Sequence, residues 1–203
     1  ARDALNKMVS ADEAFAASFS GVKAITGFTL NDDNGDDSVL SKAKITSDGA
    51  SDPLYRVQAY RYAWRALPLL ETSSAGSGAL NLKPDNDGVL RNVPLIYRLN
   101  GKPVPSLDAE ALREALAPMA VHGAEGTIPG VDADPRIANI TFGGFSVPTR
   151  RDGAFAIWFA RDTQARALNA SSVMNNATRP NLKNTIVIIA PPGETVKTPA
   201  GMK

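Results

Sequence analysis

The 203-residue chain contains no cysteine and only one histidine, His122. The absence of cysteine excludes a disulfide scaffold, thiolate zinc sites and a cysteine nucleophile. With one histidine, a histidine-based metal cluster is impossible, and acid–base catalysis by imidazole would rest on His122 alone. Because no G-x-S-x-G elbow accompanies it, serine hydrolase chemistry has little support. A histidine at the surface or at the edge of the core is the favoured interpretation.

The chain also lacks long hydrophobic runs and an excess of either charge. Its longest strongly apolar run, Ile186–Ala190, is far shorter than the roughly 20 residues of a membrane-spanning helix, and no signal-peptide pattern opens the sequence. The 22 basic and 21 acidic residues give a formal net charge of +1, which argues against nucleic acid as a partner. Neither G-x-G-x-x-G nor G-x-x-x-x-G-K-[ST] occurs, so phosphate-binding loops of those types are excluded.

What is present is the composition of a globular protein. Hydrophobic residues make up 43% of the chain and charged residues 21%, while 16 glycines and 14 prolines indicate many turns. A chain of this length can bury about 70% of its unfolded surface in one core. With no internal repeat and no linker composition, we expect a single domain over residues 1–203. The chain opens at Ala1 without an initiator methionine and stops at Lys203, so it reads as a segment of a longer protein.

Local patterns predict helices interspersed with strands. Ser10 and Glu13 have the S-x-x-E spacing of a capping box, which predicts a helix ending near residue 20. Ser106 opens the clearest helix, which Pro118 ends. Further short helices are expected at 69–75 and 170–175, and strands at 22–28, 55–65, 79–82, 89–98, 137–142, 154–159 and 185–190. These elements predict an α/β fold with a mixed β-sheet, flanking helices and at least one β-hairpin.

Turn signals indicate how the strands connect. The Asp-Gly pair at 87–88 predicts a hairpin between 79–82 and 89–98, and glycines and charges at 143–153 predict a second between 137–142 and 154–159. Pro94 cannot donate to a ladder, so its strand should lie at an edge or carry a bulge. The β-branched run at 185–190 is typical of a central strand covered on both faces. The polar stretches 31–37 and 46–53 should be loops outside the core, and 119–136 shows little pattern.

Asp85-Asn86-Asp87-Gly88 admits a functional and a structural interpretation. Paired carboxylates of this kind can form part of a calcium loop or a metal–diphosphate site. A full calcium loop needs a further acidic or amide ligand and a glutamate at its twelfth position, but positions 89 and 96 are Val and Ile. A turn, in which aspartate bonds to its own backbone and glycine takes a positive φ, is therefore favoured. Residues 31–37 also concentrate carboxylates, but they do not have the spacing of a calcium loop, so a solvated loop is favoured over a cation site.

The stretch 55–65 (YRVQAYRYAWR) mixes aromatic rings with arginines. Such a mixture can stack on bases, sugars or organic anions. Its alternation would place Tyr60, Tyr62 and Trp64 on one face of a strand and Arg61 and Arg65 on the other, and a half-buried strand is the favoured interpretation.

Several motifs together resemble a known family. Residues 84–95 read P-D-N-D-G-V-L-R-N-V-P-L, and Pro105-Ser106-Leu107 with the helix after it, Val147-Pro148-Thr149, Asp152-Gly153, Leu182–Ala190 and Thr198-Pro199 follow in the family's order. The chain thereby resembles the type 2 CHASE domain, a sensory extracellular domain associated with cyclases and histidine kinases. The resemblance spans about residues 22–199. Family members usually have a further strand-helix-strand portion before the point where this chain starts, so that portion is expected to be missing.

The resemblance implies a sensory module of a bacterial inner-membrane receptor, on its periplasmic or cell-surface side. It implies membrane helices beside the domain and a cytoplasmic adenylate or guanylate cyclase, histidine kinase or serine/threonine kinase. It implies no enzymatic role, cofactor or metal for the domain itself. The partner would be an unidentified small molecule or periplasmic protein, or a second copy in a homodimer, with no nucleic acid. No ligand-binding residue is assigned.

Two other classes stay open from the residues alone. One is a metal-dependent or carboxylate-based hydrolase that uses Asp85 and Asp87. The other is an extracellular spacer that dimerises receptors without binding a ligand.

Overall fold

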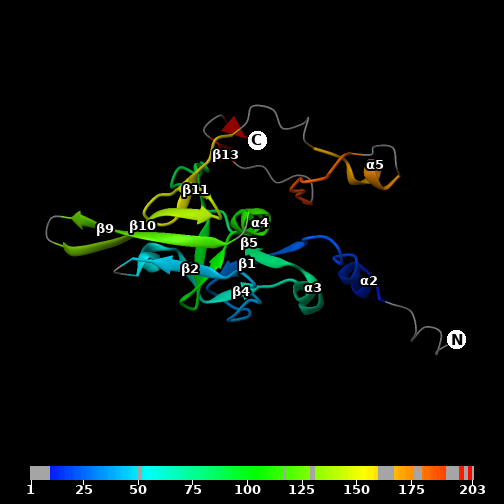
Figure 1. The fold of residues 1–203 in the computed structure, drawn as a ribbon, viewed down its shortest axis with the longest axis horizontal. Coiled ribbons are helices and arrows are strands. Elements are labelled where there is room, and N and C mark those ends of the chain that lie inside the picture. The colour runs from blue at the N-terminus through cyan, green and yellow to red at the C-terminus, as the bar shows by residue number, and fades with distance from the viewer. Residues whose placement is uncertain are drawn as a thin grey trace. The chain divides into compact units, whose positions relative to one another are not determined.

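The computed structural model describes residues 10–49, 52–116, 118–128, 131–159, 167–175, 180–190, 197–198 and 201–202 (Figure 1). The chain divides into two units. The first comprises residues 1–83 and 92–156, and the second comprises residues 84–91 and 157–203. The second unit contains helix α5 (Ala170–Met174) and the paired two-residue strands β13 (Lys197–Thr198) and β14 (Gly201–Met202). The other helices and strands belong to the first unit. The fold is of the α/β class with mixed sheets, as the sequence predicts.

One sheet of the first unit has three strands in the order β4-β1-β5. Strand β1 (Ile25–Asn31) runs antiparallel to β4 (Tyr62–Trp64) and parallel to β5 (Gly76–Ala79). The strand predicted at 22–28 therefore exists, with its bounds three residues further along. Helix α4 (Leu107–Leu116) packs against β5 and β1, and the predicted helix after Ser106 is confirmed.

The largest sheet has four strands in the order β11-β10-β9-β2. Its long antiparallel pair, β9 (Met119–Ile128) and β10 (Val131–Phe142), occupies the stretch in which the sequence shows little pattern. Strand β11 (Phe145–Pro148) forms a hairpin with β10 across residues 143–144. Strand β2 (Ile45–Asp48) pairs parallel with β9, so the first half of the loop predicted at 46–53 is wrong: it forms an edge strand.

Both predicted hairpins need correction. A turn exists at 85–88, but β5 pairs with β1, and the strands after the turn pair elsewhere. Strand β6 (Asn92–Pro94) pairs with β12 (Ala154–Ala156), and β7 (Ile96–Leu99) pairs with β8 (Lys102–Pro105) and with β3 (Ala59–Tyr60). Because β6 and β12 form a two-stranded sheet, Pro94 does lie on an edge strand. The second predicted hairpin is wrong in its partner, since β10 pairs with β11 instead of β12.

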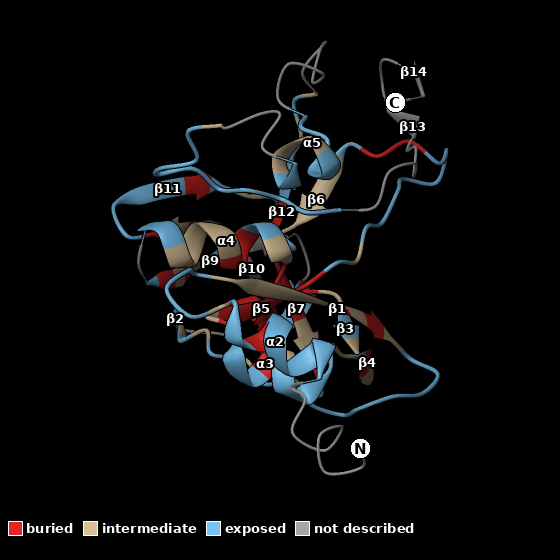
Figure 2. Cartoon of the chain, turned by 90° about the vertical axis from the view of Figure 1, so that its right-hand side faces the viewer, coloured by how far each residue is buried: buried red, intermediate tan, exposed pale blue. Residues whose placement is uncertain are grey.

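Strand β7 contributes side chains to both hydrophobic cores of the first unit. Buried residues are red in Figure 2. Successive side chains of a strand point to opposite faces. Ile96 accordingly lies in one core and its neighbour Tyr97 in the other, and both are buried. The first core also contains Leu54, Val57, Leu95, Ala109, Met119, Val121, Ile137, Ile140, Phe142 and Val147, and the second contains Phe28, Leu30, Ala63, Ala79, Leu99 and Val104.

The N-terminal helices are mostly exposed and contact each other (Figure 2). Helix α2 (Ala11–Ala17) carries the predicted capping box: the amide of Glu13 donates to Ser10 Oγ over 3.1 Å, and the amide of Ser10 donates to a Glu13 carboxylate oxygen over 2.8 Å. Helix α3 (Pro68–Ser73) is the short helix predicted at 69–75.

The strand predicted at 55–65 is wrong as one element. A 3-10 helix, η1 (Pro53–Arg56), opens this stretch, and β3 and β4 follow it in two different sheets. Because β3 and β4 belong to different sheets, the side chains of this stretch do not alternate between the two faces of a single strand. Ala63 is buried and Trp64 is 58% exposed.

The central strand predicted at 185–190 is also wrong. These residues have no regular secondary structure and are exposed, with Ile189 at 93%. The preference of β-branched residues for strands depends on packing against neighbours. Among the described strands none pairs with this segment, so the run stays unpaired.

Candidate functional site

Asp85 and Asp87 serve a turn of the second unit. Gly88 has a φ of +75°, its amide donates to the Asp85 carbonyl over 2.8 Å, and the amide of Val89 donates to an Asp87 carboxylate oxygen over 3.0 Å. Arg91 then donates to both carboxylates at 2.8 to 3.0 Å. These two aspartates raise the pKa of Arg91 through their hydrogen bonds. The turn interpretation is confirmed. Within the described residues, no group of three or more acidic, histidine or cysteine side chains is placed to hold a metal ion.

His122 connects three strands of the four-stranded sheet. Its Nδ1 lies 2.7 Å from an Asp48 carboxylate oxygen on β2, and its Nε2 lies 3.0 Å from Thr141 Oγ1 on β10. The hydrogen bond with His122 is the main reason that the pKa of Asp48 is lowered, and the amide of Gly123 adds to the effect. Asp48, His122 and Thr141 form a chain of contacts in the order acid, base and hydroxyl nucleophile, as in a catalytic triad. However, Thr141 lies within the sheet and is paired with both β9 and β11. Backbone amides around it are committed to ladders and are not free to stabilise an oxyanion.

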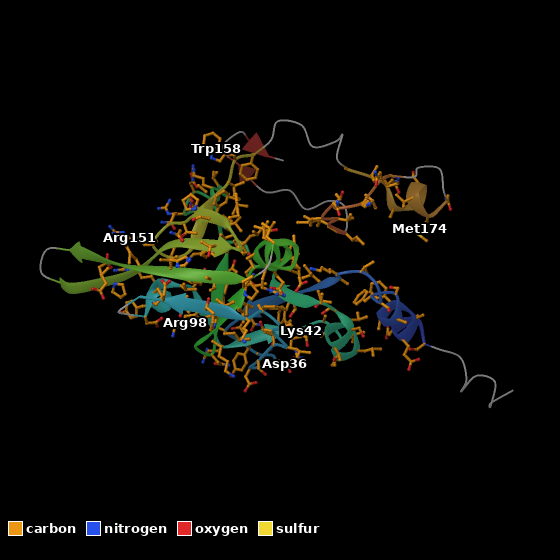
Figure 3. All side chains as sticks on the ribbon, viewed as in Figure 1. Asp36, Lys42, Arg98, Arg151, Trp158 and Met174 are labelled. Carbon is orange, nitrogen blue, oxygen red and sulfur yellow. The ribbon has the colours of Figure 1, made fainter. Side chains whose placement is uncertain are left out.

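The charged residues of the first unit do form a hollow of about 420 Å³. It is lined by Arg56 of η1 and by Arg150, Arg151 and Asp152 of the turn between β11 and β12. Figure 3 labels Arg151 on that turn. Each of these four described lining residues carries a charge, so the hollow is suited to a polar, charged occupant.

The arginines are held by a buried carboxylate behind the hollow. The side chain of Asp134 on β10 is fully buried and accepts hydrogen bonds from Arg56 Nε at 2.9 Å, from Arg56 Nη2, and from Arg151 Nη1 at 3.2 Å. Its partner across the ladder is Gly126, where a Cβ would lie 3.0 Å from Arg136 Nη1 and 3.3 Å from an Asp134 carboxylate oxygen. Glycine on β9 therefore leaves room for the Arg136 guanidinium and for this carboxylate.

Backbone hydrogen bonds fix the turn that carries the other arginines. The amide of Ile137 on β10 donates to the Arg151 carbonyl over 3.1 Å, and the amide of Gly153 donates to the Arg150 carbonyl over 3.0 Å. An Asp152 carboxylate oxygen accepts from the amide of Ala154 over 3.2 Å. The hollow and the carboxylate behind it thus come from three separate segments of the chain: η1, β10 and the turn between β11 and β12.

Sequence reasoning missed this site. The run R-R-D-G at 150–153 was visible only as a turn, and Asp134 falls within the stretch without pattern. Arg56 was grouped with the aromatic residues of 55–65. Two adjacent arginines before an Asp-Gly turn are a weak signal, and the buried acid that orients them appears only with the fold.

Two further buried carboxylates, Glu71 and Glu110, are structural. Glu71 is 1% exposed and accepts from Arg65 Nε at 3.1 to 3.2 Å. Glu110 is completely buried and accepts from Arg113 at 2.8 and 2.9 Å. Arg65 precedes the helix α3 that carries Glu71, whereas Glu110 and Arg113 lie one turn apart on α4, so both pairs are local contacts.

Asp85, Asp87 and His122 are thus engaged in a turn and in strand ladders, and the described part of the first unit includes a hollow lined by charged side chains. The model of the CHASE2 domain family matches residues 1–201, and the chain belongs to this family. CHASE2 domains are extracellular sensory domains of signalling receptors and are not catalytic. No curated protein and no solved structure matches the chain. In the part of the chain that the structure describes, no helix has the length and apolar character needed to cross a membrane.

Proposed function

We propose that residues 1–203 act as one extracytoplasmic sensor domain of a bacterial inner-membrane receptor. The signal would pass through adjacent membrane helices to a cytoplasmic cyclase, histidine kinase or serine/threonine kinase. The observation that carries the proposal is the family match over residues 1–201. Support comes from the local roles of Asp85, Asp87 and His122, which leave the charged hollow as the candidate point of contact with a ligand.

The mechanism is a shift between two arrangements of the receptor. A ligand moves such an equilibrium only by the difference between its affinities for the two arrangements. To move it from 1:99 to 99:1, the ligand must bind the favoured arrangement roughly 10⁴-fold more tightly. A sensor domain therefore needs a site whose geometry differs between the arrangements.

The first experiment is to sequence the gene outward from both ends of this segment. We expect hydrophobic segments of membrane-spanning length, joined to a cyclase or kinase domain. A stop codon close to codon 203, without a hydrophobic segment on either side, would overturn the receptor proposal.

The second experiment deletes the domain from the full-length receptor and measures the output of the cytoplasmic domain. We expect the deletion to change the output or abolish its response to the growth medium. An unchanged output would contradict a sensory role and favour a passive spacer. In that case the isolated chain should dimerise in a concentration-dependent way.

A further inference from the structure

We infer that the hollow lined by Arg56, Arg150, Arg151 and Asp152 binds a small oxyanion, a carboxylate or phosphate group free in solution. This inference rests on the proposed sensory function and names the ligand class of its site. The first observation is the balance of charged groups around the hollow. The three guanidinium groups outnumber the carboxylates of Asp134 and Asp152, so the cluster retains a positive charge.

Asp134 fixes the arginines without exhausting their donors. A guanidinium has five N–H donors in a planar fork. Asp134 takes the Nε and Nη2 groups of Arg56 and only the Nη1 group of Arg151. The Arg56 and Arg151 side chains are 39% and 57% exposed, so their remaining N–H groups can face the hollow. A buried acid that orients two guanidinium groups lowers the entropy cost of holding them in place for an anion.

Arg150 supplies the uncompensated charge. Among the described residues, its side chain has no carboxylate within salt-bridge distance, although it is exposed and lines the same hollow. The Asp152 carboxylate bonds to the backbone of its own turn. A cation would therefore meet more positive than negative charge, whereas an oxyanion would meet the guanidinium groups of Arg56, Arg150 and Arg151.

The size and lining of the hollow restrict the ligand further. Binding sites for drug-sized ligands are lined mainly by apolar side chains. The described residues that line this hollow of about 420 Å³ are all charged, which suits a small and strongly polar group. Guanidinium groups bind carboxylates and phosphates through two parallel N–H···O bonds, and both groups therefore fit the same donors.

The test titrates the 203-residue chain with inorganic phosphate and, separately, with succinate at low ionic strength. Binding is followed by calorimetry and by the NMR signals of the arginine Nε–H groups. We expect saturable binding of at least one probe, with shifts at Arg56 and Arg151. Arg150→Ala should weaken it about 3- to 10-fold, the loss of one exposed charge-assisted contact. Arg150→Lys should retain more of the binding than Arg150→Ala but less than the unmodified chain, because lysine keeps the charge but lacks the paired N–H donors of the guanidinium group.

The matched control is Lys102→Ala. It removes the same charge from an exposed position on β8 that does not line the hollow. If Lys102→Ala weakens binding as much as Arg150→Ala, the effect is general electrostatics and the site is overturned. Absence of saturable binding of both probes to the unmodified chain, at concentrations up to tens of millimolar, overturns it as well.

The two proposals fail in different ways. A chain that binds phosphate or succinate, in a receptor whose output ignores deletion of the domain, keeps the site and contradicts the sensory function. A receptor that needs the domain but responds normally with Arg150→Ala and Arg151→Ala overturns the anion as its signal and keeps the sensory function.

Discussion

A Cβ placed on Gly76 would lie 1.8 Å from Oε1 of Glu110. Strand β5, which begins at Gly76, thus lies directly against the buried carboxylate of α4. Glu110 cannot move away cheaply, because it is completely buried and holds Arg113 at 2.8 and 2.9 Å.

Gly76→Ala should therefore destabilise the fold by about 3 kcal/mol, the sum of overpacking and disturbance of a buried ion pair. Urea unfolding followed by circular dichroism measures the change. Gly144→Ala is the matched control, since a Cβ there meets nothing within 4 Å, and its effect should stay within about 0.5 kcal/mol. Equal stability of the two variants would contradict the close approach of β5 and α4.

The pair Arg65–Glu71 gives a second prediction about stability. The Arg65 side chain is 23% exposed and Glu71 is almost fully buried, and their hydrogen bond raises the pKa of Arg65. Arg65→Met leaves the Glu71 carboxylate buried without its partner and should cost about 3 kcal/mol. The double variant Arg65→Met/Glu71→Leu should recover most of that loss in the same unfolding assay. A double variant as unstable as the single one would show that the pair itself contributes the stability.

The Asp48–His122 contact should make stability depend on pH in acid. The pKa of Asp48 in the folded chain is lowered from its usual 3.8. The unfolded state therefore binds a proton first as the pH falls, so the contribution of Asp48 is complete above about pH 5 and is lost as the pH falls below 3.8 through the folded pKa. The difference in free energy of unfolding between the unmodified chain and Asp48→Asn should be constant near neutrality and shrink in that acid range.

His122→Gln is the control for this effect, because it removes the main cause of the lowered pKa. In the His122→Gln background, Asp48→Asn should change stability with much less dependence on pH. The same pH profile in both backgrounds would contradict the assigned cause.

The turn at 85–88 predicts insensitivity to calcium. Asp87 is engaged with the amide of Val89 and with Arg91, so Asp87→Asn should lower stability by no more than about 1 kcal/mol, as for other exposed ion pairs. Millimolar CaCl2 should leave the Tm of both chains unchanged in differential scanning fluorimetry. A rise in Tm for the unmodified chain alone would restore the metal-site hypothesis for Asp85 and Asp87.

Elements with local signals were predictable from the sequence. The capping box of Ser10 and Glu13 and the helix after Ser106 depend on residues within one or two turns of each other. One local signal was overlooked: Asn100-Gly101 both have positive φ and close the β7–β8 hairpin, as the dipeptide Asn-Gly indicates.

The long strands were hidden by irregular pairing. Strand β10 shifts register against β9 between Ile137 and Asn139, so Ile137 and Ile140 are both buried although they are three residues apart. The alternation of buried and exposed side chains along a strand is interrupted at such a bulge. The candidate site was hidden for a different reason. Arg56 and Asp134 lie 78 residues apart in the sequence and meet only through tertiary packing.

The parallel pairing of β2 with β9 has a consequence for how the protein folds. The contact between Asp48 and His122 spans 74 residues, so β2 has no ladder partner until β9 has been synthesised. At 5 to 20 residues per second, this interval lasts roughly 4 to 15 seconds. A nascent chain therefore carries the unpaired β2 segment for seconds, and an unpaired strand is where a chaperone would bind or a neighbouring chain would aggregate.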